Sequence, residues 1–334
     1  WNVLYFQLSI AIVIFLLLYF YGDFILGFFI NSKAILNAGA TYLDYRNFSL
    51  FFSFTGFALM SFYTGIGKTK PIIYSTVILA LLNFCLNYVF VFGKMGFSPM
   101  GIAGVGLASS IAEAGASIFL LVFTFFSNIQ KQFQLFKNHL LSLNLIKSII
   151  KLSIPIVTQF LFGIGSWFLF FSCIEKLGEQ ELAISNIIKT LYLFFMVPTT
   201  GLGSAGQTII SNLLGQRGQN MVWPTTVKIL WLSIICTSIS CAAILIFPTS
   251  FLSIITNDVS LIAASKPLLY LLTSILMLYS ISSGIYYTVI GVGAIRASLK
   301  IQIAAVFGYL LFTYFVVFIL KGGLLMAWLA EFVY

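Results

Sequence analysis

The stretch Ser127–Lys151, SNIQKQFQLFKNHLLSLNLIKSIIK, is the one long polar passage of this chain. Its basic residues are Lys131, Lys137, Lys147, Lys151 and the single histidine, His139. It contains no carboxylate, and long apolar runs begin on both sides of it. We interpret it as a basic segment that lies along one membrane face and joins two bundles of helices.

The composition outside this stretch is that of a membrane protein. Of all residues, 60% are hydrophobic and only 7% are charged, and the mean hydropathy is +1.08. Soluble domains carry about 25% charged residues, so a soluble globular fold is excluded. The excess of 17 Lys+Arg over 8 Asp+Glu is explained below by membrane topology, and we expect no nucleic-acid partner. The four cysteines show no metal-ligand spacing, and no metal site is expected.

Apolar runs of the length that crosses a bilayer, ~20 residues, recur along the whole chain. Nine complete spans and one partial span are predicted. They cover residues 3–20, 45–66, 72–93, 101–126, 148–173, 182–210, 226–248, 267–290 and 298–320, with the partial span from 322. The predicted fold class is an all-α polytopic membrane protein.

Charged residues segregate between alternate loops. One set of loops holds Lys68, Lys70, the linker lysines, Arg217, Lys228, Arg296 and Lys300, and no acid. The opposite loops hold acidic and basic residues in equal number. Because basic loops mark the cytoplasmic side, the linker 127–151 is predicted to be cytoplasmic, and the protein to be a multi-pass protein of the plasma (inner) membrane.

An internal repeat relates the two ends of the chain. The second span ends in Phe62-Tyr63-Thr64-Gly65-Ile66-Gly67, and the eighth ends in Tyr286-Tyr287-Thr288-Val289-Ile290-Gly291, an offset of 224 (286 − 62). Ala112-Glu113 and Ala330-Glu331 match at an offset of 218 (331 − 113). Spans one to four therefore pair with spans seven to ten, which predicts two parallel six-helix lobes in the full protein.

This repeat sets the predicted domains. They are an N-terminal lobe (1–126), a basic linker (127–147) and a C-terminal lobe (148–334). Spans five and six lack repeat partners before Trp1, and the last span is cut at Tyr334. We expect the chain to be part of a longer protein, without about the first two helices and most of the last.

Glu113 lies near the centre of its span. A lone charge in hydrocarbon costs about 2.5–3.5 kcal/mol on insertion scales, so this side chain must face protein or a wet cavity. It is either a protonatable, cation-attracting group or a carboxyl that only braces two helices. The same alternatives hold for Glu331, while Asp44 and Arg46 are expected to form a structural ion pair.

Amide side chains add further polar groups to the spans. Asn83 and Asn87, at i and i+4, share one helix face, and Gln159 and Asn186 lie in later spans. Such amides either join helices or line a polar path. We predict Glu113, Asn83, Asn87, Gln159 and Asn186 as substrate- or ion-binding residues.

The sixth predicted span and its exit are rich in small and polar residues, from Pro198 through Gln207. Proline inside a helix frees a carbonyl, and glycine allows close approach or bending. The sequence therefore predicts a hinge or cavity helix, or a tightly packed static one. The predicted hinge and cavity residues are Pro155 in the fifth span and Pro198, Gly201, Gly203 and Gln207 in the sixth.

Several of these motifs, in this order, resemble the multidrug and toxic compound extrusion (MATE) transporters. They are Phe62–Pro71, Asn83-x3-Asn87-x5-Gly93, Gly101-x2-Gly104-x-Gly106-x6-Glu113, Leu177-Gly178 to Asn186, and Pro198 through Gln207 to Gln216. The resemblance covers nearly the whole chain, with Trp1 near the third of twelve helices. It implies two six-helix lobes, a central cavity and antiport of organic cations against protons or sodium.

Two features depart from that family's pattern. The first helix, which carries a coupling aspartate in many members, is not in this sequence. Asn87 stands where many members have aspartate, and Gly163 stands near a position where some sodium-coupled members have glutamate. The resemblance therefore leaves the coupling ion open between proton and sodium, and implies no other cofactor.

Three functions are weighed. An antiporter that exports small organic cations, expected as a monomer among membrane lipids, fits the few buried acids and the many aromatic rings. A flippase for a lipid-linked saccharide or cell-wall precursor is the alternative, and it would need several basic residues within the spans, where only Lys189 and Arg46 qualify. An intramembrane enzyme is not expected, because His139 has no catalytic or metal-binding companions.

Overall fold

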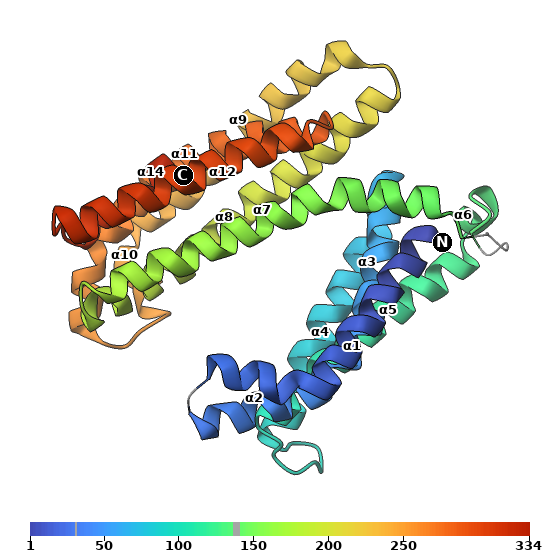
Figure 1. Cartoon of the computed structure of the whole chain (residues 1–334), viewed down its shortest axis with the longest axis horizontal. Helices are drawn as coiled ribbons and strands as arrows, with labels where there is room; N and C mark the ends of the chain where they lie inside the picture. Colours follow the sequence, from blue (N-terminus) through green and yellow to red (C-terminus); the bar gives the residue numbers. More distant parts are fainter. Residues whose placement is uncertain (31, 136–140) are drawn as a thin grey trace. The chain divides into compact units, whose positions relative to one another are not determined.

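The described chain is helical throughout (Figure 1). The computed structural model describes residues 1–30, 32–135 and 141–334, and within these ranges it contains helices, turns and no strand. Lys137, Asn138 and His139 of the predicted linker lie outside the described residues. The chain divides into two compact units, Trp1–Ile150 and Lys151–Tyr334.

Unit 1 contains α1 (Asn2–Phe29), α2 (Lys33–Arg46), α3 (Ser49–Gly65), α4 (Lys70–Phe92), α5 (Ile102–Phe126), α6 (Asn128–Gln132) and the start of α7 (Leu143–Glu175). Unit 2 contains the rest of α7, α8 (Glu179–Gly215), η1 (Gln219–Met221), α9 (Val222–Ile246), α10 (Pro248–Ser253), α11 (Val259–Gly291), α12 (Ile295–Tyr314), the π-helical turn η2 (Phe315–Ile319), α13 (Leu324–Trp328) and α14 (Ala330–Val333).

Eight described helices are long and apolar enough to span a membrane, and the bent pair α2–α3 makes a ninth. This agrees with the nine complete spans predicted from the sequence. One element was missed, because the second span was predicted to begin at residue 45. The chain is already helical from Lys33, and α2 meets α3 at an angle of 57°. The mixed polar and apolar composition of α2 hides it from a search for continuous apolar runs.

Helix α5 is the centre of unit 1. It packs against α2, α3 and α4, and α1 packs against α2 and α3 (Figure 1). Small residues let the helices approach closely. A Cβ at Gly104 would lie 2.9 Å from the backbone carbon of Phe90, and one at Gly106 would lie 2.9 Å from the backbone oxygen of Tyr42. Larger residues at these positions would therefore separate α5 from its neighbours.

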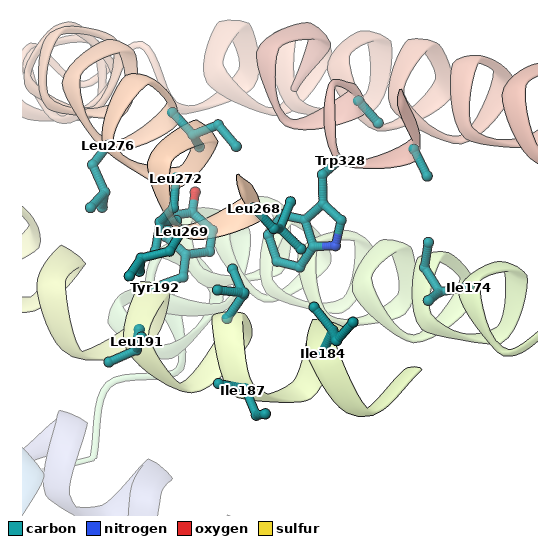
Figure 2. Packing of buried hydrophobic residues seen from close by; sticks show 14 of the residues in the cluster. Ile174, Ile184, Ile187, Leu191, Tyr192, Leu268, Leu269, Leu272, Leu276 and Trp328 are labelled. Atoms are coloured by element: carbon teal, nitrogen blue, oxygen red, sulfur yellow. The ribbon is translucent and has the colours of Figure 1, made fainter. Parts of the chain in front are cut away.

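Unit 2 is built around α8, α9 and α11, which pack on one another. Its core is formed mainly by leucine, isoleucine and aromatic side chains from α7, α8, α11 and α13 (Figure 2). Figure 2 shows Tyr192 of α8 beside Leu269 and Leu272 of α11, and Trp328 beside Leu268. The helix α11 begins at a true cap, since the Asp258 side chain accepts hydrogen bonds from the backbone N–H groups of Ser260 and Leu261.

The helix–helix contacts show the predicted repeat. The pairs α1·α3, α3·α5, α4·α5 and α3·α4 correspond to α9·α11, α11·α14, α12·α14 and α11·α12, and all eight pairs are in contact. The turns after α3 and α11 also match. Gly67 and Gly293 both have positive φ. Their backbone N–H groups donate hydrogen bonds to the carbonyl oxygens of Thr64 and Ile290 respectively.

These turns correct the register of the repeat. They correspond at an offset of 226 (293 − 67), which aligns Gly65-Ile66-Gly67 with Gly291-Val292-Gly293. The sequence match at 224 was therefore two residues out of register. The reason is that only a glycine takes the left-handed conformation of this turn without strain, so the turn glycine and not the tyrosine sets the correspondence.

The predicted linker is partly helical. Residues 127–147 include α6 and the first turn of α7, and the division between the two units falls inside α7. The cytoplasmic placement of this segment stays a prediction.

Candidate functional site

A row of polar side chains follows one face of α12 in unit 2. Its members are Ser298, Gln302, Tyr309 and Thr313, spaced by four, seven and four residues. Such spacing keeps side chains on one helical face. Ser298, Tyr309 and Thr313 are fully buried, so this face points into the unit. Polar groups from α7, α11 and α14 meet it there.

Gln159 joins three helices at one end of this row. Its Nε2 donates to Ser298 Oγ at 2.9 Å, and its Oε1 accepts a hydrogen bond from the Tyr286 hydroxyl of α11. The side chain is only 6% exposed, and both ends of the amide are satisfied. Four residues earlier, Pro155 lies inside α7 and cannot donate to the preceding turn. Gln159, which was predicted to bind substrate or ion, is therefore a buried side chain whose hydrogen bonds join α7 to α11 and α12.

The middle of the row lies next to Gly163. Gln302 Nε2 donates to the Tyr334 hydroxyl at 2.6 Å. A Cβ at Gly163 would lie 3.8 Å from that hydroxyl oxygen and 3.9 Å from Gln302 Nε2. A larger side chain at position 163 would therefore point at this hydrogen-bonded pair.

Glu331 lies beside the other end of the row. The residue is 7% exposed, and its Oε1 accepts a hydrogen bond from the Tyr309 hydroxyl at 3.2 Å. Tyr192 and Trp167 lie next to the same carboxyl. Its Oε2 has no hydrogen-bond partner among the residues that the structure describes. Burying a carboxylate without such partners is costly, so this group differs from every other acid in the described chain.

The surroundings of Glu331 are aromatic. Phe170 packs against both Tyr309 and Trp328, with ring centroids 5.4 and 5.6 Å apart. The indole nitrogen of Trp328, seen in Figure 2, donates to Ser185 Oγ of α8 at 3.1 Å. In the described ranges the only ion pair lies in unit 1, so Glu331 has no basic partner there.

Glu113 of unit 1 has the opposite environment. One oxygen of the carboxylate pairs with the Arg46 guanidinium and the other accepts from the Ser53 hydroxyl. Arg46 also donates to Ser49 Oγ at 3.0 Å. The pair is partly buried, with side chains 29% and 21% exposed. The expected pair of Asp44 with Arg46 is therefore wrong, because the bend between α2 and α3 turns Arg46 toward α5.

Glu113 and Glu331 are not equivalent in the repeat. Glu113 lies 11 residues after the start of α5 and Glu331 lies 7 after the start of α13 (113 − 102; 331 − 324). Glu113 bonds to residues at the ends of α2 and α3, whereas Glu331 bonds to α12, the counterpart of α4. The sequence match at 218 was therefore accidental, since the two carboxyls face different neighbours.

Asn83 and Asn87, on α4, make hydrogen bonds separate from those of Glu113 on α5. Asn83 Nδ2 donates to Ser109 Oγ of α5 at 3.0 Å, and Asn87 Nδ2 donates to Asn83 Oδ1 at 3.0 Å. Among the described residues, the hydrogen bonds of Glu113 go to Arg46 and Ser53 and not to these amides. The structure places these amides between α4 and α5, where they join helices, and their role as ligands stays a prediction.

Asn186 is on the exposed face of α8. Its Oδ1 accepts a hydrogen bond from Lys189 Nζ at 2.8 Å, and that amine lies 4.4 Å from the centroid of the Phe171 ring. Asn186 therefore orients the one lysine that the sequence places inside a span.

The glycine-rich part of α8 combines open and closed positions. Pro198 lies inside the helix, and a Cβ at Gly201 would meet nothing within 4 Å. A Cβ at Gly203 would collide with the ring of Tyr287, and a Cβ at Gly291 would lie 3.0 Å from the backbone oxygen of Gln207. Tight packing and free space thus alternate along one helix, and its role as a hinge stays a prediction.

Three parts of this arrangement escaped sequence reasoning: the tyrosines around Glu331, the pairing of Arg46, and the α12 row. Only the α12 row had a readable signal, the four-and-seven spacing of its polar residues. The others join residues from helices far apart in the chain.

A family model described as MatE matches residues 2–89 and 155–315. Among similar curated proteins, a probable multidrug resistance protein NorM of Mannheimia succiniciproducens is 26% identical over 210 residues, which are 62% of this chain and 45% of that protein. The multidrug resistance protein NorM of Vibrio vulnificus is 30% identical over 161 residues, which are 48% of this chain and 35% of that protein. The chain spans about half the length of the curated relatives it matches.

Solved structures show the same fold. A multidrug resistance MATE family transporter of the MOP superfamily, in its outward-facing conformation, has a TM-score of 0.88 at 17% identity and covers 99% of this chain and 74% of that one. A MOP superfamily transporter from Pyrococcus furiosus, whose binding pocket is described as having reverse polarity, has a TM-score of 0.87 at 17% identity, with 99% and 74% covered.

Proposed function

This chain belongs to the MATE family of transporters, and from that premise we propose that the protein exports small organic cations in exchange for protons or sodium ions. It is a multi-pass protein of the inner membrane. The transport cycle would be alternating access, in which two lobes rock about a site near the middle of the bilayer.

The observation that carries the exchange is the buried Glu331. Its carboxyl accepts a hydrogen bond from Tyr309, lies beside Tyr192 and Trp167, and forms no ion pair with a basic side chain among the described residues. The protonated form carries no charge and is cheap to bury, whereas the carboxylate requires a cation in the same low-dielectric place. A proton and a cation therefore compete for one group, and this competition is sufficient to couple their movements in opposite directions.

The polar row on α12 supports the same proposal. Gln159, Ser298 and Gln302 continue the polar path from Glu331 along α12, inside a unit whose core is otherwise apolar. Intramembrane polar residues of this kind mark ion and substrate routes in transporters. Glu113, Asn83, Asn87 and Asn186 remain proposed binding residues at other places in the two units.

Of the two basic residues that could bind an anionic substrate in the flippase alternative, one is already paired. A lipid-linked anionic substrate needs unpaired basic groups within the spans, and Arg46 is neutralised by Glu113. Lys189 is then the one basic candidate left, and a single ammonium group is too little charge to hold the diphosphate of a lipid-linked substrate.

Transport in liposomes tests the proposal. The full-length protein is reconstituted, and uptake of a fluorescent aromatic cation is measured with a proton gradient and with a sodium gradient imposed separately. We expect accumulation against the concentration gradient under one of the two and none without a gradient. Equal uptake under all three conditions, or none in any, would show that the protein is not a coupled exporter of cations.

A further inference from the structure

Helix α7 is longer than a membrane span. Its 33 residues extend about 50 Å at 1.5 Å per residue, whereas the hydrocarbon core is about 30 Å thick. Keeping the whole helix in the core would need a tilt of about 53°, and membrane helices tilt by about 0–40°. At a tilt of about 20°, the core contains about 21 residues of the helix. About 12 residues of α7 therefore lie outside the core.

The extra residues are those before Pro155. At the other end of α7 the charged pair Glu175 and Lys176 follows the apolar run directly, so the core boundary lies at the end of the helix. Counting about 21 residues back from Glu175 reaches Pro155. The segment outside the core is therefore Leu143–Ile154.

The packing of α7 on α12 gives the same boundary. Gln159 Nε2 lies 3.4 Å from the carbonyl oxygen of Ile295, the first residue of α12. Phe170 packs on Tyr309 with ring centroids 5.4 Å apart, so the two helices run in the same direction. Gln159 is thus level with the beginning of α12, and the residues before Pro155 extend past it.

One face of this segment is polar and basic. Asn144, Lys147, Ser148 and Lys151 follow at i, i+3, i+4 and i+7, which places them on one side of the helix. All four are exposed. Within the described residues the one ion pair lies elsewhere in the chain, so neither lysine is paired with a carboxylate there. Two ammonium groups one turn apart are complementary to an anionic surface.

The other face of the segment is apolar and uncovered. Leu145, Ile149 and Leu152 share it at i, i+4 and i+7, and the two leucines are 54% and 57% exposed. The headgroup layer is only about 5–7 Å thick, whereas Leu145 lies ten residues, about 15 Å, before Pro155. If α7 continued straight, Leu145 would lie in water. Proline inside a helix is where helices bend, and a bend at Pro155 would bring this face onto the membrane.

The first turn of α7 is held at the end of another span. The backbone N–H of Ser142 donates to Asn2 Oδ1 at 2.7 Å. Asn2 is the first residue of α1, and the charge pattern of the loops predicts that this end of α1 lies at the cytoplasmic surface. The segment thus begins at the level of that surface and ends, at Pro155, where α7 enters the core. A helix that lies along the membrane surface satisfies both conditions.

We propose that Leu143–Ile154 is an interfacial helix that binds the phosphate groups of anionic phospholipids in the cytoplasmic leaflet. Its leucines and isoleucines insert at the boundary between headgroups and acyl chains, and Lys147 and Lys151 donate charge-assisted hydrogen bonds to the phosphates. Basic amphipathic helices bind membrane surfaces in this way. The lipid site lies outside the transport path, and it does not depend on the proposed export of cations.

A fluorescent label at Leu145 tests this placement. The full-length protein, with its four native cysteines replaced, carries Leu145→Cys labelled with bimane and is reconstituted in liposomes. Nitroxide groups on the acyl chains of phosphatidylglycerol or phosphatidylcholine quench a label that contacts lipid, and iodide on both sides of the membrane quenches a label in water. We expect lipid to quench Leu145→Cys strongly and iodide to quench it weakly. Asn144→Cys, on the polar face, should be quenched more by iodide.

The same label reports the headgroup preference. At equal mole fractions, phosphatidylglycerol should quench the Leu145→Cys label more than phosphatidylcholine does. Lys147→Gln combined with Lys151→Gln should lower this preference by about fivefold or more, because each lysine near an anionic surface contributes attraction of that order. The corresponding double arginine variant should keep it. Lys176→Gln removes an exposed lysine beyond the other end of α7 and should leave the preference unchanged.

Four results would overturn the proposal. A label quenched by iodide and not by lipid would place the segment in water. A label quenched by neither would show that other helices of the full protein cover the apolar face. Equal quenching by the two lipids would show a helix on the membrane without a phosphate site. A preference that Lys176→Gln removes as effectively as the double glutamine variant would show a general effect of net charge.

Discussion

Glu331 and Glu113, one in each unit, show how strongly single residues depend on their neighbours. Glu113 is held by Arg46 and Ser53, so its charge is compensated. Glu331 is more deeply buried, has Tyr309 as its donor, and has an unpartnered oxygen among the described residues. Glu331 is therefore the proposed exchanging group, and Glu113 stays a predicted binding residue whose charge is already paired.

Replacing Glu331 with Gln keeps the shape of the side chain and one acceptor for Tyr309 but removes titration. We expect gradient-driven efflux to fall at least tenfold, with little loss of thermal stability in detergent, because a neutral amide is no harder to bury than the acid. Tyr309→Phe is the matched control. It removes the hydrogen bond, costs about 1 kcal/mol, and should leave coupled transport measurable. Normal efflux by Glu331→Gln would move the coupling elsewhere.

The Glu113–Arg46 pair allows a double-mutant test of bracing against coupling. Glu113→Leu alone leaves Arg46 partly buried without its partner, and we expect it to destabilise the protein by about 1–3 kcal/mol. Glu113→Leu with Arg46→Met removes both charges and should recover most of the melting temperature. If Glu113 only braces helices, efflux recovers together with stability. Recovery of stability without recovery of efflux would assign a transport role to this pair.

At the scale of a helix, α8 combines a position closed by packing with an open one two residues away. The Cβ of any residue at 203 would overlap the Tyr287 ring, while position 201 has open space around it. Helical glycine costs about 1 kcal/mol relative to alanine. Packing does not require a glycine at position 201, and bending of α8 is the role predicted for it.

Alanine at each position separates packing from bending. Gly203→Ala should reduce the free energy of unfolding by about 1–3 kcal/mol, because α8 and α11 must move apart or Tyr287 must turn away. The melting temperature should therefore fall. Gly201→Ala should keep or raise the melting temperature and slow the transport cycle if the helix bends there. The measurements are thermal melting in detergent and efflux rate in liposomes. A Gly203→Ala protein as stable as wild type would show that Tyr287 adapts at no cost.

At the scale of the whole molecule, the alternating charges of the loops predict which side of the membrane each loop occupies. Lys131 in α6 belongs to the basic set and Lys94, after α4, belongs to the mixed set, and both side chains are exposed. In a background with the four native cysteines replaced, Lys94→Cys should react with a membrane-impermeant maleimide added to intact cells. Lys131→Cys should react only after the membrane is permeabilised. The reverse pattern would invert the topology.

Several properties of this protein follow from the amino-acid sequence alone. Hydropathy predicted nine of the membrane spans, since each must supply about 20 apolar residues whatever its neighbours are. The repeat was also readable, although its register was off by two residues until the turn glycines Gly67 and Gly293 were located. The polar residues within the spans were recognised because each is costly in hydrocarbon.

What each polar residue contacts was decided only by the tertiary structure. Asp44, two residues away in the sequence, was the expected partner of Arg46, but the bend between α2 and α3 brings Arg46 to Glu113, 67 positions along the chain. Asn83 and Glu113 were expected to form one polar cluster, but Asn83 of α4 donates to Ser109 of α5, while Glu113 pairs with Arg46 of α2 and Ser53 of α3. Helical periodicity shows which residues share a face, but it does not show which helix packs against that face. The side chains around Glu331 come from α7, α8 and α12, and no local sequence pattern predicts that these residues lie together.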